Sequence, residues 1–296
     1  MAPVLETFDL TKTYPTAAAV RGIDLRVPSH SVCAFLGQNG AGKSTTLRML
    51  MGMVRPTSGT GHIFGYDIAR EDHSVRIRQR TAFVAEDKRL YEYMTVAQIL
   101  RFTRSFFPAW REDLERRLLA EFELPLDRKI RRLSKGMRTK LALLLAFARG
   151  SDLLILDEPT EGLDPVSIEL VLQLIVSLVA DGATVFFSSH QIAEVEQIAD
   201  HVVMINHGKI VLDASMDAVK SGYRHIQVVF SEPVSKLDFN FAGIERVDAE
   251  GAVVSVVASR NVEEIVERFR GMRVNNIDVA PLSLKEIFLE RVKASL

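Results

Sequence analysis

One glycine-rich run has the residue types and spacing of a phosphate-binding loop. Residues 37–44 are Gly-Gln-Asn-Gly-Ala-Gly-Lys-Ser, which fits the pattern G-x-x-x-x-G-K-[ST]. They follow an apolar run at 32–36 and precede a predicted helix that begins near Lys43. Glycines let successive backbone N–H groups turn toward phosphate oxygens, and the helix N-terminus adds the positive end of a dipole. We therefore expect Lys43 to reach the β- and γ-phosphates of a nucleotide and the Ser44 hydroxyl to ligate Mg²⁺.

A second run, residues 153–158, is apolar and ends in two acids, Leu-Leu-Ile-Leu-Asp-Glu. In open α/β sheets ligands bind at the carboxyl ends of the strands, which is where Asp157 and Glu158 would lie. Asp157 suits the shell of Mg²⁺, through water, and Glu158 suits a carboxylate that polarises the attacking water. Taken alone, the two acids are equally consistent with a solvated strand end. Beside a phosphate loop, the nucleotide interpretation is favoured.

The elements that must position these residues can be predicted from the hydrophobic pattern. Short apolar runs alternate with helical patterns up to about residue 215, which is typical of an α/β fold with a buried parallel sheet. These runs are residues 31–36, 81–85, 153–156, 184–187 and 201–205. Residues 87–150 are helical in pattern and rich in charge, with residues 113–123 as the clearest helix. We interpret them as a helical subdomain inserted into a nucleotide-binding domain that spans residues 1–215.

The pattern changes after Asp217, where a second domain is predicted over residues 216–296. Four runs there have the pattern of strands: residues 225–230, 243–248, 252–258 and 274–279. Two capping-box signals predict helices: Asn261 with Glu264, and Ser283 with Glu286. The sequence therefore predicts a small α+β domain at the C-terminal side, with a ferredoxin-like arrangement as the candidate fold.

Composition excludes several classes of protein. The 296 residues are 47% hydrophobic and 25% charged, which is ordinary for a globular chain. A net charge of −1 gives no basic field, so we expect no nucleic-acid partner. The single cysteine, Cys33, fits a reducing compartment, and the N-terminus lacks the pattern of a secretory signal. Because no run reaches the roughly 18–20 apolar residues of a membrane helix, we expect a cytoplasmic protein that acts on a membrane only through a partner.

Residues 133–137, Leu-Ser-Lys-Gly-Met, indicate to which class of phosphate-loop NTPases the chain belongs. A Ser-x-Gly helix start is by itself a routine N-cap. Its place between the phosphate loop and the acid run resembles the ABC ATPase family, whose signature is a Leu-Ser-Gly-Gly-Gln-like segment in this position. The resemblance covers about residues 4–215, and the motifs occur in the family's order. It implies a P-loop NTPase fold of the α/β class with an inserted helical subdomain.

The resemblance also implies roles for single residues. Asp164 matches the loop that contacts an opposing subunit, His190 matches the switch histidine that touches the γ-phosphate, and Tyr14 matches the aromatic that stacks on adenine. For Tyr14, a structural, partly buried ring is the alternative. The residues expected to contact ATP are Tyr14, Gly37, Asn39, Gly40, Ala41, Gly42, Lys43, Ser44, Thr45, Glu86, Ser134, Gly136 and Asp164. The expected catalytic residues are Glu158, His190 and Lys43, and the expected Mg²⁺ ligands are Ser44, Asp157 and Glu86.

Three positions depart from the family pattern. Glu86 stands where the family usually has glutamine, and Lys135 and Met137 stand where glycine and glutamine are commonest. A carboxylate at position 86 can still ligate Mg²⁺ but adds a charge, which leaves the details of coupling open. Ser134 and Gly136, the groups expected to meet the γ-phosphate of an opposing chain, are retained. We therefore expect hydrolysis to be retained.

A set of segments together resembles single-domain bacterial ATPases of drug, antibiotic and lipid-type ABC exporters: Glu86 and residues 90–96, 107–110, 133–137 and 283–289. The resemblance implies a head-to-tail dimer with a second copy of the domain or a paralogue. Each ATP then lies between Lys43 and Ser44 of one chain and Ser134 and Gly136 of the other. It also implies an integral membrane permease as partner and a peripheral position on the inner face of the cell membrane. Soluble ABC ATPases of DNA repair or translation, inert ATP-binding cassettes and nucleotide kinases are the alternative interpretations.

Overall fold

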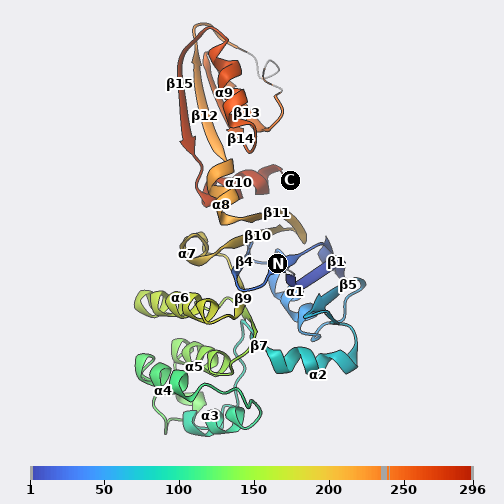
Figure 1. Ribbon diagram of the computed structural model, residues 1–296, viewed down its shortest axis with the longest axis vertical. Helices are drawn as coiled ribbons and strands as arrows, with labels where there is room; N and C mark the ends of the chain where they lie inside the picture. The colour runs from blue at the N-terminus through green and yellow to red at the C-terminus, as the bar shows by residue number, and fades with distance from the viewer. Residues whose placement is uncertain (1–2, 235–238, 240, 295–296) are drawn as a thin grey trace. The chain divides into compact units, whose positions relative to one another are not determined.

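The computed structural model describes residues 3–234, 239 and 241–294. The chain divides into two compact units after Asp213. The first holds both nucleotide motifs, and the second holds the C-terminal strands and helices (Figure 1). The predicted mixed α/β fold of the first unit is confirmed.

The core of the first unit is a six-stranded sheet in the order β11-β10-β4-β9-β8-β7. Its strands are β4 (Val32–Leu36), β7 (Thr81–Val84), β8 (Leu153–Asp157), β9 (Thr184–Ser189), β10 (His201–Asn206) and β11 (Lys209–Ser215). The five strands from β10 to β7 run parallel, and every residue of β4, β8 and β9 is buried. Strands covered on both faces need continuous apolar runs, which is why the sequence pattern located all of the parallel ones.

Helices cover this sheet and fix its carboxyl edge. Helix α1 (Lys43–Leu50) contacts β8, while α6 (Pro165–Ala180) and α7 (Ile192–Ile198) pack against β4 and β9. Phe35 on β4 and Phe186 on β9 stack in the core with ring centroids 5.5 Å apart. This rigid layer places the ends of β4, β8 and β9 side by side.

A second sheet, which is antiparallel, was not predicted. Its strands come earlier in the chain than most strands of the parallel sheet. It comprises β1 (Pro3–Tyr14), β2 (Ala17–Ile23), β3 (Arg26–Pro28), β5 (Ser58–Ile63) and β6 (Tyr66–Asp67). Register shifts interrupt the pairing of β1 with its neighbours, so the period-two pattern of its sequence is broken. Helix α1 also contacts β2 and β5 and therefore lies between the two sheets. Helix α2 (Glu71–Arg80) then leads from β6 to β7.

The predicted helical insertion lies between β7 and β8. It contains α3 (Val96–Arg104), α4 (Glu112–Glu121), a 3₁₀ turn (Ile130–Arg132) and α5 (Lys135–Phe147). Thr95 and Gln98 form a capping box at the start of α3. Helix α5 packs against α3, α4 and β7, and so joins the insertion to the sheet (Figure 1).

The second unit is built on one antiparallel sheet. Its elements are α8 (Met216–Gly222), β12 (Arg224–Phe230), β13 (Ile244–Glu250), β14 (Val253–Ala258), α9 (Val262–Arg270), β15 (Val274–Pro281) and α10 (Leu284–Ala294). The strand order is β13-β14-β12-β15, so β14 separates the first two strands, as in a split β-α-β arrangement. Helix α9 packs on β12 and β15, and its Phe269 joins the apolar core of the sheet. The described residues between β12 and β13 form no helix, unlike the connection in a complete ferredoxin-like fold.

The two predicted capping boxes had different outcomes. Ser283 and Glu286 exchange hydrogen bonds through their side chains and backbone N–H groups at 2.8 and 3.3 Å, so this box is confirmed. Asn261 instead has a left-handed backbone (φ 55°) and its side chain makes no capping bond, so that box was wrong although helix α9 begins there. Asn261 reaches Ala242 O at 3.4 Å, because its conformation turns the side chain away from the helix.

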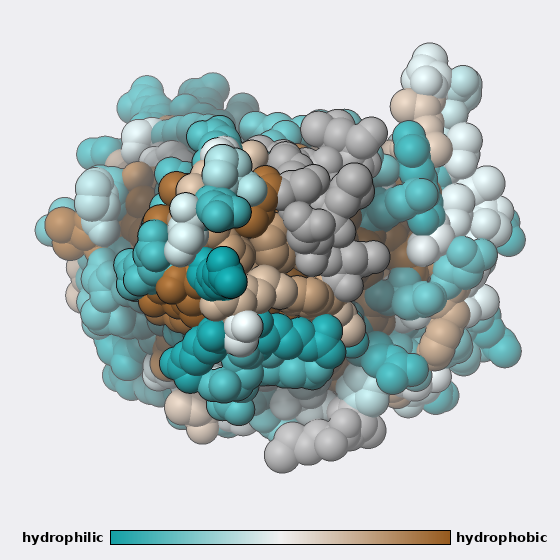
Figure 2. Space-filling view, turned by 90° about the horizontal axis from the view of Figure 1, so that it is seen from above, coloured by the Kyte–Doolittle hydropathy of each residue, from teal (hydrophilic) through white to brown (hydrophobic). Residues whose placement is uncertain are grey.

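Among the described residues, no helix combines the length and the apolar character required to span a bilayer. On the face shown in Figure 2, hydrophilic and hydrophobic residues are interspersed.

Candidate nucleotide-binding site

The predicted phosphate loop joins β4 to α1 and lies against two neighbouring strands. A Cβ on Gly37 would lie 2.6 Å from Ile205 O, and one on Gly42 would lie 2.5 Å from Ala19 O. Gly42 also has a φ of 113°, a conformation that L side chains rarely adopt. Glycine is therefore required at both positions, for reasons of packing as well as for access of backbone N–H groups to phosphate.

The remaining predicted loop residues differ in exposure. Asn39 and Gly40 are exposed at the tip, while Ala41 is buried and its carbonyl accepts a hydrogen bond from Gly208 N at 2.9 Å. Ser44 and Thr45 are half-buried in the first turn of α1. The tip is thus open while the base of the loop is fixed by the strands.

Lys43 is buried and its ammonium group is fully engaged. Its Nζ donates to Gly37 O at 2.7 Å and to Gln38 O at 3.4 Å, and it lies 3.3 Å from Glu158 Oε1. A buried ammonium requires such partners because desolvation of an unpaired charge is costly. An incoming phosphate would compete with the Glu158 carboxylate for this cation.

Oxygen atoms from three segments meet beside the loop. Ser44 Oγ lies 3.2 Å from Asp157 Oδ1 and 3.4 Å from Glu86 Oε2. Asp157 is fully buried, and its Oδ2 has no hydrogen-bond donor within the described part of the chain. A hydroxyl and two carboxylates are the hard oxygen ligands that Mg²⁺ prefers. These three predicted ligands therefore fit that ion.

Glu158 is held in an unusual backbone conformation. Its φ is 49°, its N–H donates to Ser188 Oγ at 3.0 Å, and its carbonyl accepts from Lys88 Nζ at 2.9 Å. Its carboxylate Oε2 lies 2.9 Å from Nδ1 of His190. A buried carboxylate in contact with an imidazole, at the end of a strand beside the phosphate loop, has the surroundings that a water-polarising group needs.

Several residues of this site belong to none of the sequence motifs. Ser188 donates to Asp157 Oδ1 at 2.6 Å, in addition to accepting from Glu158. Glu194 Oε2 accepts from Thr160 Oγ1 at 2.9 Å and from Ser189 Oγ at 3.2 Å. Burial raises the pKa of Glu194 above its usual range, although these two donors oppose the shift. The Thr160–Glu194–Ser189 chain ties the segment after Glu158 to the segment before His190.

The signature segment makes its contacts elsewhere. Ser134 caps α5 by accepting from Met137 N at 3.2 Å, and Lys135 pairs with Glu161 at 2.6 Å. A Cβ on Gly136 would lie 3.0 Å from Gly162 O, so the first turn of α5 packs closely on the segment after Glu158. No hydrogen bond or ion pair in the described chain joins Ser134 or Gly136 to the phosphate loop.

Two further predicted residues also lie apart from the acid cluster. Asp164 caps α6, accepting from Ser167 N at 3.0 Å and from Ser167 Oγ at 2.6 Å, and these bonds lower its pKa. Tyr14 ends β1 with 39% of its surface exposed, and Lys12 Nζ lies 5.2 Å from the centroid of its ring. The structure thus brings together Lys43, Ser44, Glu86, Asp157, Glu158 and His190. The interactions of four other predicted residues in the described chain are with residues outside this cluster: Tyr14, Ser134, Gly136 and Asp164.

Comparison with known proteins identifies the family. The family model "ABC transporter" matches residues 20–161. The bacitracin transport ATP-binding protein BcrA of Bacillus licheniformis is 34% identical over 227 residues, which cover 76% of this chain and 74% of the relative. This chain is an ABC transporter ATP-binding protein. The predicted P-loop ABC ATPase fold and the predicted ATPase activity coupled to transport are thereby confirmed.

Other similar proteins agree with this assignment. The ABC ATPase is 36% identical to the daunorubicin/doxorubicin resistance ATP-binding protein DrrA of Streptomyces peucetius, over 73% of this chain and 67% of the relative. It superimposes on a solved ATP-binding subunit of an ABC transporter with a TM-score of 0.67 and 31% identity, covering 73% of this chain and 92% of that one. Two other cassettes that share the fold, at 22% and 23% identity, were solved as dimers. Membership of this family shows that the protein binds ATP.

Proposed function

We propose that this ABC ATPase powers export through a separate integral membrane permease. The observation that carries the proposal is the buried cluster around Lys43, Asp157 and Glu158, in a chain whose relatives are named for bacitracin transport and for resistance to daunorubicin and doxorubicin. The chain itself has no helix among its described residues that could span a membrane. The path for a cargo therefore belongs to a partner, and the ATPase sits at the inner face of the membrane.

In this proposal ATP is shared by two chains arranged head to tail. Lys43 and Ser44 bind the phosphates from one chain, while Ser134 and Gly136 make no hydrogen bond to the phosphate loop of their own chain in the described residues. A second chain would bring its own Ser134 to the nucleotide, with the N-terminus of its α5 directed at the γ-phosphate. ATP then holds the two chains together, and hydrolysis separates them.

The oxygen cluster supplies the residues for Mg²⁺. Ser44, Asp157 and Glu86 would hold the ion, and the nucleotide would supply further ligands, because the described residues contain no group of three His, Cys, Asp or Glu side chains suited to a metal. When bound, Mg²⁺ neutralises charge on the phosphate oxygens. Glu158 polarises the attacking water, and His190 orients the Glu158 carboxylate through their 2.9 Å contact.

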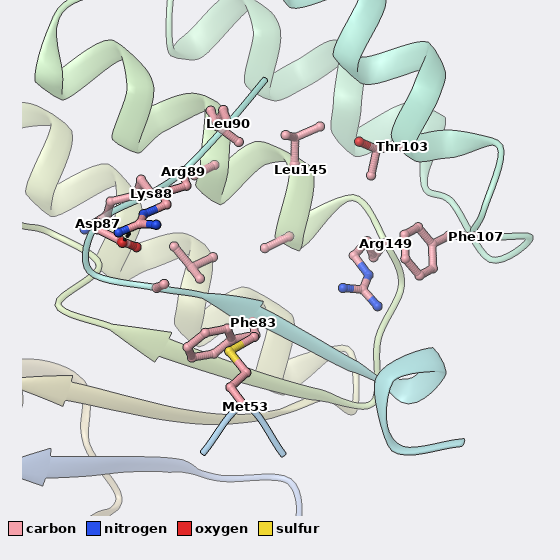
Figure 3. Close-up of a pocket in the computed structure, with 14 residues that line it drawn as sticks. Met53, Phe83, Asp87, Lys88, Arg89, Leu90, Thr103, Phe107, Leu145 and Arg149 are labelled. Atoms are coloured by element: carbon pink, nitrogen blue, oxygen red, sulfur yellow. Dashed lines mark ion pairs between the residues drawn. The ribbon is translucent and has the colours of Figure 1, made fainter. Parts of the chain in front are cut away.

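A groove beside the inserted helices is the proposed docking site for the permease. It is a cavity of about 400 Å³ with mainly apolar walls that include Phe83, Phe107 and Leu145 (Figure 3). Ring contacts extend the apolar surface from Tyr91 to Phe102 and Phe106, which are all exposed. The groove links the sheet to the helical subdomain, so an inserted segment would contact both.

The charge of the groove indicates what that segment carries. The guanidinium of Arg149 lies 3.8 Å from the ring centroid of Phe107 and donates to Arg78 O at 2.7 Å. Burial lowers its pKa to about 10, and within the described residues no carboxylate forms an ion pair with it. A half-buried cation without a carboxylate partner favours an acidic side chain on the segment that fills the groove. We therefore propose an amphipathic cytoplasmic loop of the permease with an acid on its inserted face.

Purification from native membranes tests this proposal. The tagged protein would be extracted with detergent, and its stoichiometric partners would be identified by mass spectrometry. A subunit with several membrane-spanning helices is expected. Met53→Arg, which places a cation at the exposed rim of the groove, should lose that subunit. Val75→Arg is the matched control, because Val75 is equally exposed on α2 and does not line the groove. Recovery with ribosomes, with DNA-repair proteins, or alone would contradict the transport assignment.

A further inference from the structure

Lys88 connects the proposed docking groove to the backbone of Glu158. It lies in the loop that follows β7, two residues after Glu86, and its own φ is 36°. Its Nζ donates to the Glu158 carbonyl at 2.9 Å, across 70 residues of sequence. The same side chain lines the groove together with its neighbours Asp87 and Arg89 (Figure 3). One residue therefore faces both sites.

The hydrogen bond from Lys88 matters because Glu158 has a backbone conformation that residues other than glycine rarely adopt. With a φ of 49°, the residue persists in this region only while its surroundings hold it there. Two side chains do so, one on each side of the residue: Ser188 accepts from its N–H and Lys88 donates to its carbonyl. The direction of the carboxylate toward Lys43 and His190 follows from this backbone conformation.

Acidic residues surround the Lys88 side chain. Lys88 lines one cavity together with Glu86 and Glu161, and its Nζ donates to the Glu158 carbonyl at 2.9 Å. The Lys88 ammonium group is thus held by a carbonyl of the acid segment. Its charge also offsets the extra negative charge that Glu86 brings to a position where the family usually has glutamine.

We propose that Lys88 is a positioning residue for ATP hydrolysis, which holds Glu158 in its active conformation and transmits occupancy of the groove to it. The second half of this statement rests on the proposed docking of a permease. A segment that enters the groove either displaces the loop at residues 87–90 or holds it in place. Displacement lengthens the hydrogen bond from Lys88 to Glu158, and a fixed loop keeps it short. Hydrolysis then depends on what occupies the groove, without a contact between that occupant and the nucleotide.

Steady-state ATPase kinetics of the full chain test the first half. Lys88→Met should lower kcat by about tenfold to a hundredfold, with KM for ATP changed less than about twofold, since misplacing a catalytic group by about 1 Å costs on the order of 10²-fold. Lys88→Arg keeps a donor and should recover most of the rate. Arg89→Met is the matched control, because Arg89 lines the same groove with 88% of its side chain exposed and, among the described residues, pairs with Asp87 alone. It should leave kcat unchanged.

A double variant distinguishes positioning from a general loss of structure. If Lys88 acts through the Glu158 carboxylate, Lys88→Met should lower the residual rate of Glu158→Gln by less than about twofold. A rise in KM with unchanged kcat would assign Lys88 to nucleotide binding instead. An equal loss of rate in both backgrounds, or a Lys88→Arg variant as slow as Lys88→Met, would also overturn the proposal.

The permease-bound protein tests the second half. Lys88→Met should still co-purify with the permease, and the permease should then stimulate its ATPase less than it stimulates the ATPase of the unaltered chain. Undiminished stimulation would refute transmission through Lys88. Absence of any permease would refute the proposed function, whereas the kinetics of the isolated chain would still decide whether Lys88 positions Glu158.

Discussion

Replacement of Ser188 by alanine tests how the acid pair at the end of β8 is held. The Ser188 side chain is fully buried on β9. Its hydroxyl donates to Asp157 Oδ1 at 2.6 Å and accepts from Glu158 N at 3.0 Å. Alanine is smaller, so the change removes both bonds without creating a clash. It leaves a buried N–H without an acceptor and a buried carboxylate with one donor fewer.

The expected size of the effect follows from these two bonds. An unsatisfied buried N–H costs about 1–3 kcal/mol, and a lost bond to a charged group costs about 1.5–3 kcal/mol. The free energy of unfolding should therefore fall by about 3–5 kcal/mol. Because Glu158 also loses one of the two side chains that fix its backbone, kcat should fall by roughly 10²-fold.

Urea denaturation without nucleotide and steady-state ATPase assays measure the two effects separately. Ser105→Ala is the matched control, because the Ser105 hydroxyl donates to Phe102 O at 2.7 Å on an exposed helix end. This control should change stability by less than about 0.5 kcal/mol. A Ser188→Ala variant with the stability of Ser105→Ala and a normal kcat would refute the reasoning that Ser188 holds the acid pair.

Three further predictions follow from other parts of the chain. Gly42→Ala should lower the free energy of unfolding by about 2–5 kcal/mol, because φ is 113° and the new Cβ would lie 2.5 Å from Ala19 O. The same variant should lose ATP binding, which titration calorimetry with ATP measures. Burial raises the pKa of Glu194 above its value in the unfolded chain, so the free energy of unfolding should fall as pH rises above about 4.5 and the buried carboxyl ionises. Glu194→Gln should remove that pH dependence in urea titrations. Ser283→Ala should destabilise the second unit by about 1 kcal/mol in thermal melts, because it deletes the confirmed capping box with Glu286.

The parts of the site that could be predicted from the sequence are those defined by local spacing. The phosphate loop and the acid run each occupy fewer than ten consecutive residues, and the buried parallel strands need continuous apolar runs. Strand β1 lacks such a pattern because its register shifts, between Leu10 and Thr13 among others, break the alternation. The antiparallel sheet therefore became visible only in the structure.

The residues that the sequence did not indicate act over long separations in the chain. Lys88 meets Glu158 across 70 residues, Ser188 meets Asp157 across 31, and Glu194 meets Thr160 across 34. Such pairs form only when the ends of β7, β8 and β9 are placed side by side by the sheet. Side chains without a motif of their own give no signal of this in one sequence. Asn261 shows the converse, because its residue type suggested a cap that its left-handed backbone does not make.

In the proposed mechanism two chains share ATP, and Glu158 is the carboxylate that promotes hydrolysis. Light scattering of the Glu158→Gln variant with Mg-ATP tests it most directly. A shift from the monomer mass of 33.1 kDa to twice that value is expected. Ser134→Arg in the same background should bind ATP but remain a monomer. A Glu158→Gln protein that binds ATP and stays at 33.1 kDa, or that hydrolyses it at the normal rate, would contradict the account.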